Sequence, residues 1–153
     1  MSEPDQATEE RRKVLAVLAS ASVDALSRGW EAIPARPEID VLRQPEFGMV
    51  MARGRIGGGG GAFNLGEVTV TRATVRLATG EVGVGHVLGR DRKRALLVAR
   101  FDALWQSAAY RDVVEATVVR PAAARMAEQD AATRARAAAT RVNFFTMVRG
   151  EDA

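Results

Sequence analysis

Most of the side chains that could bind an anion or a partner surround a run of consecutive glycines. The run is Gly57, Gly58, Gly59, Gly60 and Gly61. Polar and charged residues flank it: Arg53, Arg55, Asn64, Glu67 and Arg72. Arginine binds phosphate and carboxylate groups through two parallel hydrogen bonds, and glycine leaves its backbone N–H groups accessible to a ligand. These residues are therefore predicted to bind a substrate or a partner.

A second basic cluster stands at the start of a predicted helix. Its cations are Arg90, Arg92, Lys93 and Arg94. Positive charge at the N-terminal end of a helix opposes the helix macrodipole, so the cluster works against stability. Arg90 and Arg94 are therefore predicted to bind an anion at this helix start. The alternative is an exposed basic turn paired with Asp91, the expected N-cap, and with Glu81.

The chain offers little for catalysis by its own side chains. Its single histidine, His86, is predicted on the apolar face of a strand, which is more typical of a core or interface residue than of a metal ligand. Glu46 and Glu67 could act as an acid and base pair, but ion pairs with nearby arginines explain them as easily. The glycine run is a weak match to a nucleotide loop, because no Lys-Ser or Lys-Thr pair follows it and the next segment is a strand.

Composition limits the class of protein further. With 153 residues the chain suits one domain over residues 1–153. The absence of cysteine excludes disulfides, thiolate metal sites, an iron–sulfur cluster held by this chain and a cysteine nucleophile. The polar, acidic start is not a signal peptide, and no apolar run approaches the ~20 residues of a membrane span. We therefore expect a cytoplasmic protein that is not bound to a membrane.

Hydrophobic periodicity predicts helices before and after a central group of strands. The helices are expected at residues 8–20, 22–29, 91–108 and 121–141. The stretch 110–120 is ambiguous between helix and strand. The last helix is rich in alanine and has only a weak apolar stripe, so we expect thin contact with the core or close packing on a neighbouring protein.

The strands are expected at residues 47–55, 65–77 and 82–89. The apolar phase of the second strand switches near Thr71 and Arg72, which predicts a β-bulge or an exchange of the buried face. Glycines line one face of the third strand and invite close approach by a helix. The predicted fold is α+β, an antiparallel sheet of three or more strands with N-terminal and C-terminal helices packed on it.

The C-terminal tail ends in a cluster of apolar side chains, Phe144, Phe145, Met147 and Val148. Such a patch is unfavourable when it is exposed on a monomer. Phe144 and Phe145 are therefore predicted to bind a partner. Docking of the tail on the core of its own chain is the alternative.

Three separate strings in this sequence resemble the PhnG family, small subunits of the bacterial carbon–phosphorus lyase system. They are RQPEFGMVMARGRIGGGGGAFNLGEVTVTR, then GHVLGRD ahead of DALWQ, and finally TRVNFFTMVRGE. The strings fall within residues 43–107 and 140–151. Because they occur in this order, they are more specific than the glycine run alone.

The resemblance implies an accessory or non-catalytic subunit in the catabolism of organic phosphonates. Family members act with PhnI, PhnH and PhnL to make α-D-ribose 1-methylphosphonate 5-triphosphate from MgATP and methylphosphonate, releasing adenine. PhnI is credited with the nucleosidase-like step, and PhnJ later breaks the carbon–phosphorus bond. The resemblance therefore implies that PhnI, PhnH, PhnJ and PhnL are partners, that MgATP is a substrate of the complex, and that this chain binds no cofactor.

The residue types and their spacing, taken without the resemblance, are also compatible with two other functions. One is a basic nucleic-acid-binding module that uses the arginine-flanked glycine loop. A net charge of only +3 and only eight aromatic residues, most of them in apolar stripes, argue against binding to nucleic acid. The other is an autonomous enzyme with an anion site at the helix start that contains Arg90 and Arg94.

Overall fold

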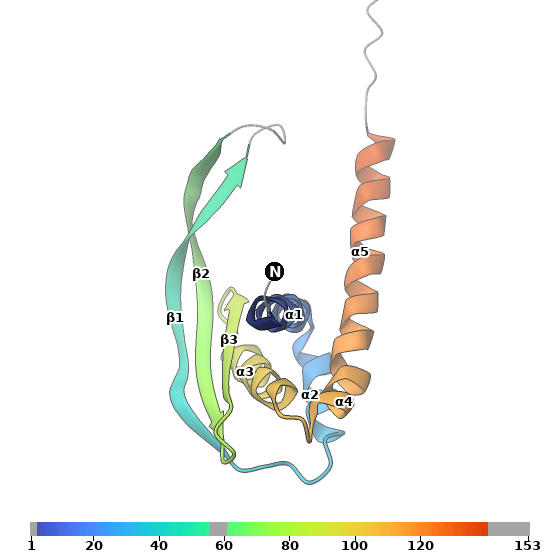
Figure 1. Cartoon of the computed structure of the whole chain (residues 1–153). Coiled ribbons are helices and arrows are strands. Elements are labelled where there is room, and N and C mark those ends of the chain that lie inside the picture. Colours follow the sequence, from blue (N-terminus) through green and yellow to red (C-terminus); the bar gives the residue numbers. More distant parts are fainter. Residues whose placement is uncertain (1–2, 56–60, 141–153) are drawn as a thin grey trace, which may run out of the picture.

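The computed structural model describes residues 3–55 and 61–140. These residues form an α+β fold in which helices precede and follow three antiparallel strands (Figure 1). In chain order the elements are α1 Glu3–Ser20, α2 Val23–Glu31, β1 Ile39–Arg55, β2 Ala62–Leu77, β3 Val82–Leu88, α3 Arg92–Gln106, α4 Arg111–Val114, the π-helical turn η1 Glu115–Val119 and α5 Arg120–Ala139. The predicted fold class and the four predicted helices are confirmed.

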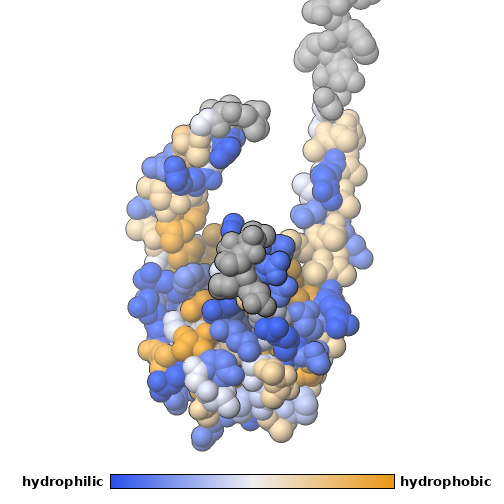
Figure 2. Space-filling view, viewed as in Figure 1, coloured by the Kyte–Doolittle hydropathy of each residue, from blue (hydrophilic) through white to orange (hydrophobic). Residues whose placement is uncertain are grey.

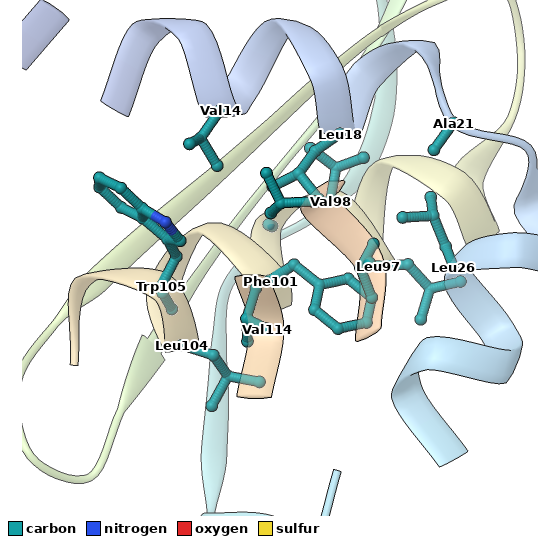
Figure 3. Close-up of a cluster of buried hydrophobic side chains, with 14 of the residues drawn as sticks. Val14, Leu18, Ala21, Leu26, Leu97, Val98, Phe101, Leu104, Trp105 and Val114 are labelled. Carbon is teal, nitrogen blue, oxygen red and sulfur yellow. The ribbon is translucent and has the colours of Figure 1, made fainter. Parts of the chain in front are cut away.

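Helix α3 is the centre of the core. It packs against β2 and β3 on one side and against α1, α2 and α4 on the other, so it is buried nearly all round. Phe101 and Leu104 are completely buried and belong to one hydrophobic cluster with Leu18 of α1 and Leu26 of α2 (Figure 3). A helix with solvent on one side would need one apolar stripe, whereas α3 needs small or apolar residues on most of its surface.

The face of β3 that carries glycines permits the close packing of α3. A Cβ atom on Gly83 would lie 2.0 Å from the carbonyl oxygen of Ala99, and one on Gly85 would lie 2.0 Å from that of Ala95. Neither carbonyl can move without moving the helix backbone. The predicted approach of a helix to this face is therefore confirmed, and the helix is α3.

The sheet has the order β1-β2-β3, and β1 is longer than predicted. The sequence placed its start near Phe47, but pairing with β2 begins at Ile39. Pro45 lies inside the strand, at an irregularity of the register between Arg43 and Glu46. An edge strand tolerates proline at such a place because the missing N–H has no ladder partner to lose.

The exchange of buried face predicted in β2 is confirmed. Val70 and Thr71 are both buried, and from Thr71 onward the odd-numbered positions face the helices. Thr71 suits a buried position because its hydroxyl donates to the carbonyl oxygen of Gly89 at 2.6 Å and accepts from the N–H of Asp91 at 3.0 Å. This side chain therefore joins the sheet to the start of α3.

A buried ion pair joins α1, α3 and β3. The carboxylate of Asp102 is fully buried, and it accepts two hydrogen bonds from Arg11, at 2.9 and 2.7 Å. It also accepts the N–H of Val84 at 2.8 Å. The hydrogen bonds to Asp102 raise the pKa of the Arg11 guanidinium above its ordinary value. This pair was not predicted from the sequence.

Residues 111–139 form one nearly continuous helical segment, because α4, η1 and α5 follow each other without a break. The ambiguous stretch 110–120 is therefore helical. The main contacts of α5 are with α1 and η1, and Ala122 is its only buried residue. Every residue from Ala127 to Ala139 is exposed, which confirms the predicted thin contact. Among the described residues, no helix is long and apolar enough to cross a membrane.

Candidate functional site

The strands β1 and β2 continue as a two-stranded ribbon beyond the end of β3. The last residue of β3, Leu88, pairs with Val70, so residues 49–55 and 62–69 pair only with each other. We call these two segments the arm. Figure 1 shows the arm and α5 projecting from the same side of the molecule, and Figure 2 shows that their side chains leave the space between them open.

The arm exposes large apolar side chains: Met49, Val50, Met51, Phe63 and Leu65. Met49 is 67% exposed and Met51 is 51% exposed. In the register, Met49 and Met51 lie on the face of the sheet that α3 covers further along, so they face the open side of the molecule. Large exposed apolar side chains of this kind are typical of a surface that another protein covers.

The predicted residues next to the glycine run lie at the tip of the arm. Arg53 pairs with Asn64 and Arg55 pairs with Ala62, and both arginines are exposed. A shallow cavity of about 350 Å³ is lined by Arg53, Gly54, Arg55 and Ala62. Gly61 is exposed beside it, and nothing would lie within 4 Å of a Cβ atom there. The predictions for Gly57, Gly58, Gly59 and Gly60, and for Phe144 and Phe145, lie outside the described residues.

The structure separates Arg72 from the other two arginines of the predicted cluster. Arg72 is eight positions from Asn64 on β2, which is about 25 Å along a strand. It pairs with Glu46 at 3.2 Å on the face of the sheet away from α3. The expected clustering of Arg72 with Arg53 and Arg55 is therefore wrong, although each remains a predicted contact for a partner.

The two carboxylates considered for acid and base chemistry do not meet. Glu46 lies opposite Arg72, and Glu67 is five positions further along the same ladder, opposite Met51. That separation is about 17 Å, and the two side chains belong to opposite faces of the sheet. Glu67 forms no ion pair with any residue that the structure describes, so its predicted role in binding stays a prediction.

The cations at the start of α3 diverge instead of forming one site. Arg90 and Arg92 lie over the ring of Phe47, at 5.6 and 4.6 Å from its centre. Arg94 donates to the carbonyl oxygen of Leu88 at 2.8 Å. Asp91 caps the helix as predicted, because its carboxylate accepts the N–H of Arg94 at 2.9 Å. Arg90 and Arg94 therefore contact different parts of the protein, and their predicted binding of an anion stays a prediction.

His86 is exposed, which rules out a place in the core and leaves the interface alternative as a prediction. It pairs with Arg72 on the outer face of the sheet, because the helices cover the face that carries the glycines and Val87. A surface position beside a cation is unsuitable for a metal ligand that lacks other donors. No group of three or more metal-ligating side chains occurs within residues 3–55 and 61–140.

Two further pKa shifts lie away from the arm. A hydrogen bond from Thr79 lowers the pKa of Glu81 in the turn between β2 and β3. Burial lowers the pKa of Arg100, and repulsion from Arg36 lowers it further. Both arginines lie over the ring of Trp30, at 4.9 and 5.6 Å from its centre, so this group is part of the packing around α2.

Comparison with known families decides what kind of protein carries this arm. The sequence model of the family described as "Phosphonate metabolism protein PhnG" matches residues 9–150. The chain belongs to the PhnG family. A relative from Rhizobium meliloti (strain 1021), named alpha-D-ribose 1-methylphosphonate 5-triphosphate synthase subunit PhnG, is 55% identical over 148 residues. The alignment covers 97% of this chain and 94% of the relative, so the likeness extends well beyond the three strings noticed in the sequence.

Within this PhnG chain, the arginines at the tip of the arm provide a direct test of the predicted site. Replacing Arg53 and Arg55 together with alanine should weaken assembly with other subunits at least about tenfold. Hydrogen bonds to charged groups contribute about 1.5–3 kcal/mol each, and neither arginine has an ion pair among the described residues.

The matched control is the replacement of Arg43 and Arg76, which lie on the same two strands and pair with Glu46 and Asp40. Pull-down with the tagged chain measures the effect. If the Arg53 and Arg55 variant recovers other subunits at the wild-type level, the predicted contact does not exist.

Proposed function

We propose that this chain is a subunit of the enzyme that makes α-D-ribose 1-methylphosphonate 5-triphosphate, with an accessory role in which it holds other subunits. The observation that carries the proposal is the 55% identity, over almost the whole of both chains, with a relative named as the PhnG subunit of that synthase. Two chains that occupy the same place in an assembly are expected to align over nearly their whole lengths, as these two do.

The proposed reaction joins methylphosphonate to the ribose of MgATP. An oxygen of the phosphonate attacks the anomeric carbon C1′, the bond from C1′ to N9 breaks, and adenine leaves with the electron pair and takes up a proton. The triphosphate remains on the 5′ carbon. This displacement needs a group that assists departure of the base, and we assign that step to PhnI.

The geometry of this chain supports an accessory role. Glu46 and Glu67, the two carboxylates considered for acid and base chemistry, lie on opposite faces of the sheet. The single histidine is at the outer surface beside Arg72. By contrast, the surfaces that project from the body are apolar on the arm and rich in alanine on α5, which suits contact with protein.

We propose that another subunit of the complex fills the space between the arm and α5. Met49 and Met51 lie on the face of the arm that α3 covers further along the sheet. The exposed segment Ala127–Ala139 belongs to α5, on the other side of the open space (Figure 1). Alanine sustains a helix without packing, and its small side chain lets another backbone approach closely. PhnI is the partner we propose first, followed by PhnH, PhnJ and PhnL.

Binding to nucleic acid has little support. The arginines that would have formed one basic surface are separated, because Arg72 pairs with Glu46 and the cations Arg90 and Arg92 lie over Phe47. Neither comparison with known proteins indicates nucleic acid.

Omission of this chain from a reconstituted mixture tests the proposal. With PhnI, PhnH, PhnL, MgATP and methylphosphonate present, addition of this chain should be required for adenine release. We expect release to fall by at least about tenfold when the chain is left out, because its partners then lack the surface on which they assemble. Equal release with and without the chain would overturn the proposed function, whereas release by this chain alone would overturn its accessory role.

A further inference from the structure

A cavity of about 600 Å³ lies between α2 and α5, away from the arm. Its walls come from α2, η1 and α5, with Arg94 at the start of α3. Binding sites for small molecules usually have volumes of about 300–1,000 Å³. The cavity is therefore large enough for a metabolite of the size of a nucleotide.

The charges around this cavity are all positive. Arg28, Arg94 and Arg125 line it, and no aspartate or glutamate does. Among the described residues, the side chains of Arg28 and Arg125 form no hydrogen bond and no ion pair, although Asp24 and Glu128 lie one helical turn away from them. Two unpaired guanidinium groups at one cavity favour an anion between them.

The rest of the wall combines apolar surface with uncommitted polar groups. Ala25, Ala122 and Met126 supply the apolar part. Gln129 forms no hydrogen bond within the described part of the chain, and the hydroxyl oxygen of Ser22 accepts the N–H of Ala25 at 3.2 Å, which leaves its own proton available to donate. A ligand with both an anionic and an uncharged part would match this wall.

We propose that this cavity binds a phosphorylated small molecule. Arg28 and Arg125 hold its phosphate group, and its organic part lies on the surface formed by Ala25, Ala122 and Met126. The inference stands apart from the proposed place of the chain in the synthase, because it rests on the lining of a cavity to which the arm contributes nothing.

Titration of the purified full chain with ATP, tripolyphosphate and adenosine tests this inference. Isothermal calorimetry should show binding of ATP and weaker binding of tripolyphosphate, which lacks the organic part, while adenosine should not bind. Replacing Arg28 and Arg125 with alanine should weaken ATP binding at least about tenfold, since each removes hydrogen bonds to a charged group. Without ligand the melting temperature should be unchanged, because neither arginine has a described partner.

The matched control replaces Arg134 and Arg136, two exposed arginines of α5 that do not line the cavity. It removes the same charge and should leave ATP affinity within about twofold of the wild type, since exposed charges at this distance are screened by salt. Equal weakening by both double variants would show non-specific attraction and overturn the proposal. The absence of binding at millimolar ATP would also overturn the proposal. The same holds if ATP does not bind and the Arg28 and Arg125 variant instead releases a protein partner.

Discussion

Replacing Arg11 with alanine should lower the free energy of unfolding by about 3 kcal/mol, which corresponds to a fall of roughly 6 to 12 °C in the melting temperature. The reason is Asp102, whose side chain is 0% exposed and whose charge Arg11 balances at 2.7 Å. Without Arg11 the carboxylate stays buried beside the N–H of Val84. Circular dichroism during thermal and urea unfolding measures the change.

Arg12 provides the matched control on the same helix. Its side chain is 81% exposed and its ion pair with Glu9 is 3.4 Å long at the surface, so Arg12→Ala should change stability by no more than about 0.5 kcal/mol. The double variant Arg11→Ala with Asp102→Ala should be more stable than the sum of the single effects predicts, because the unpaired buried charge is gone. If the single changes in the free energy of unfolding simply add in the double variant, the pair of Arg11 and Asp102 does not stabilise the fold. An equal loss of stability for Arg11→Ala and Arg12→Ala would lead to the same conclusion.

Replacing Met49 and Met51 with lysine should abolish recovery of the other subunits with this chain, a loss of at least about a hundredfold in affinity. An interface that covers these side chains would have to desolvate two charges without partners, at a cost of several kcal/mol. Both side chains are more than half exposed in the isolated chain, so its own stability should change little. Pull-down with the tagged chain measures the loss.

The control for this variant keeps the apolar character of the arm. Met49→Leu with Met51→Leu conserves both volume and hydrophobicity, so assembly should be retained. Thermal unfolding of each isolated variant shows whether the fold is intact. If the lysine variant folds normally and still recovers its partners, the face of the arm that carries Met49 and Met51 is not the docking surface.

Patterns within one element were readable from the sequence. Alternation in β3 placed Gly83 and Gly85 on one face, and their lack of side chains is the reason that α3 can approach. The capping residue Asp91 was also predicted from local sequence, since its carboxylate accepts a backbone N–H three residues later. The thin contact of α5 also followed from its own composition.

Relations between distant elements were not readable in this way. Arg11 and Asp102 are 91 positions apart, and periodicity carries no information about which charge meets which. Asp102 is the one acidic residue of α3 and stands between Phe101 and Ala103. It was the one available signal, because a buried charge requires a partner. The arginines of the cavity between α2 and α5 come from three elements and gave no local signal.

The register of the sheet caused the errors at the predicted site. Arg53, Arg55 and Arg72 were grouped because they flank the glycine run in sequence, but a hairpin brings together residues at equal distance from its turn. Arg72 therefore pairs with Glu46, far from the tip of the arm. His86 was assigned to the apolar face of β3, whereas α3 covers the opposite face, where glycine allows it to pack closely.

The most direct test of the proposed function is the mass of the particle in which this chain exists. A tagged chain should be purified from cells that use methylphosphonate as their only source of phosphorus, and its mass measured by light scattering during size-exclusion chromatography. We expect a particle several times the mass of a single chain that contains PhnI and releases adenine from MgATP and methylphosphonate. A stable single chain under these conditions, with no associated subunit and no adenine release, would contradict the proposed function.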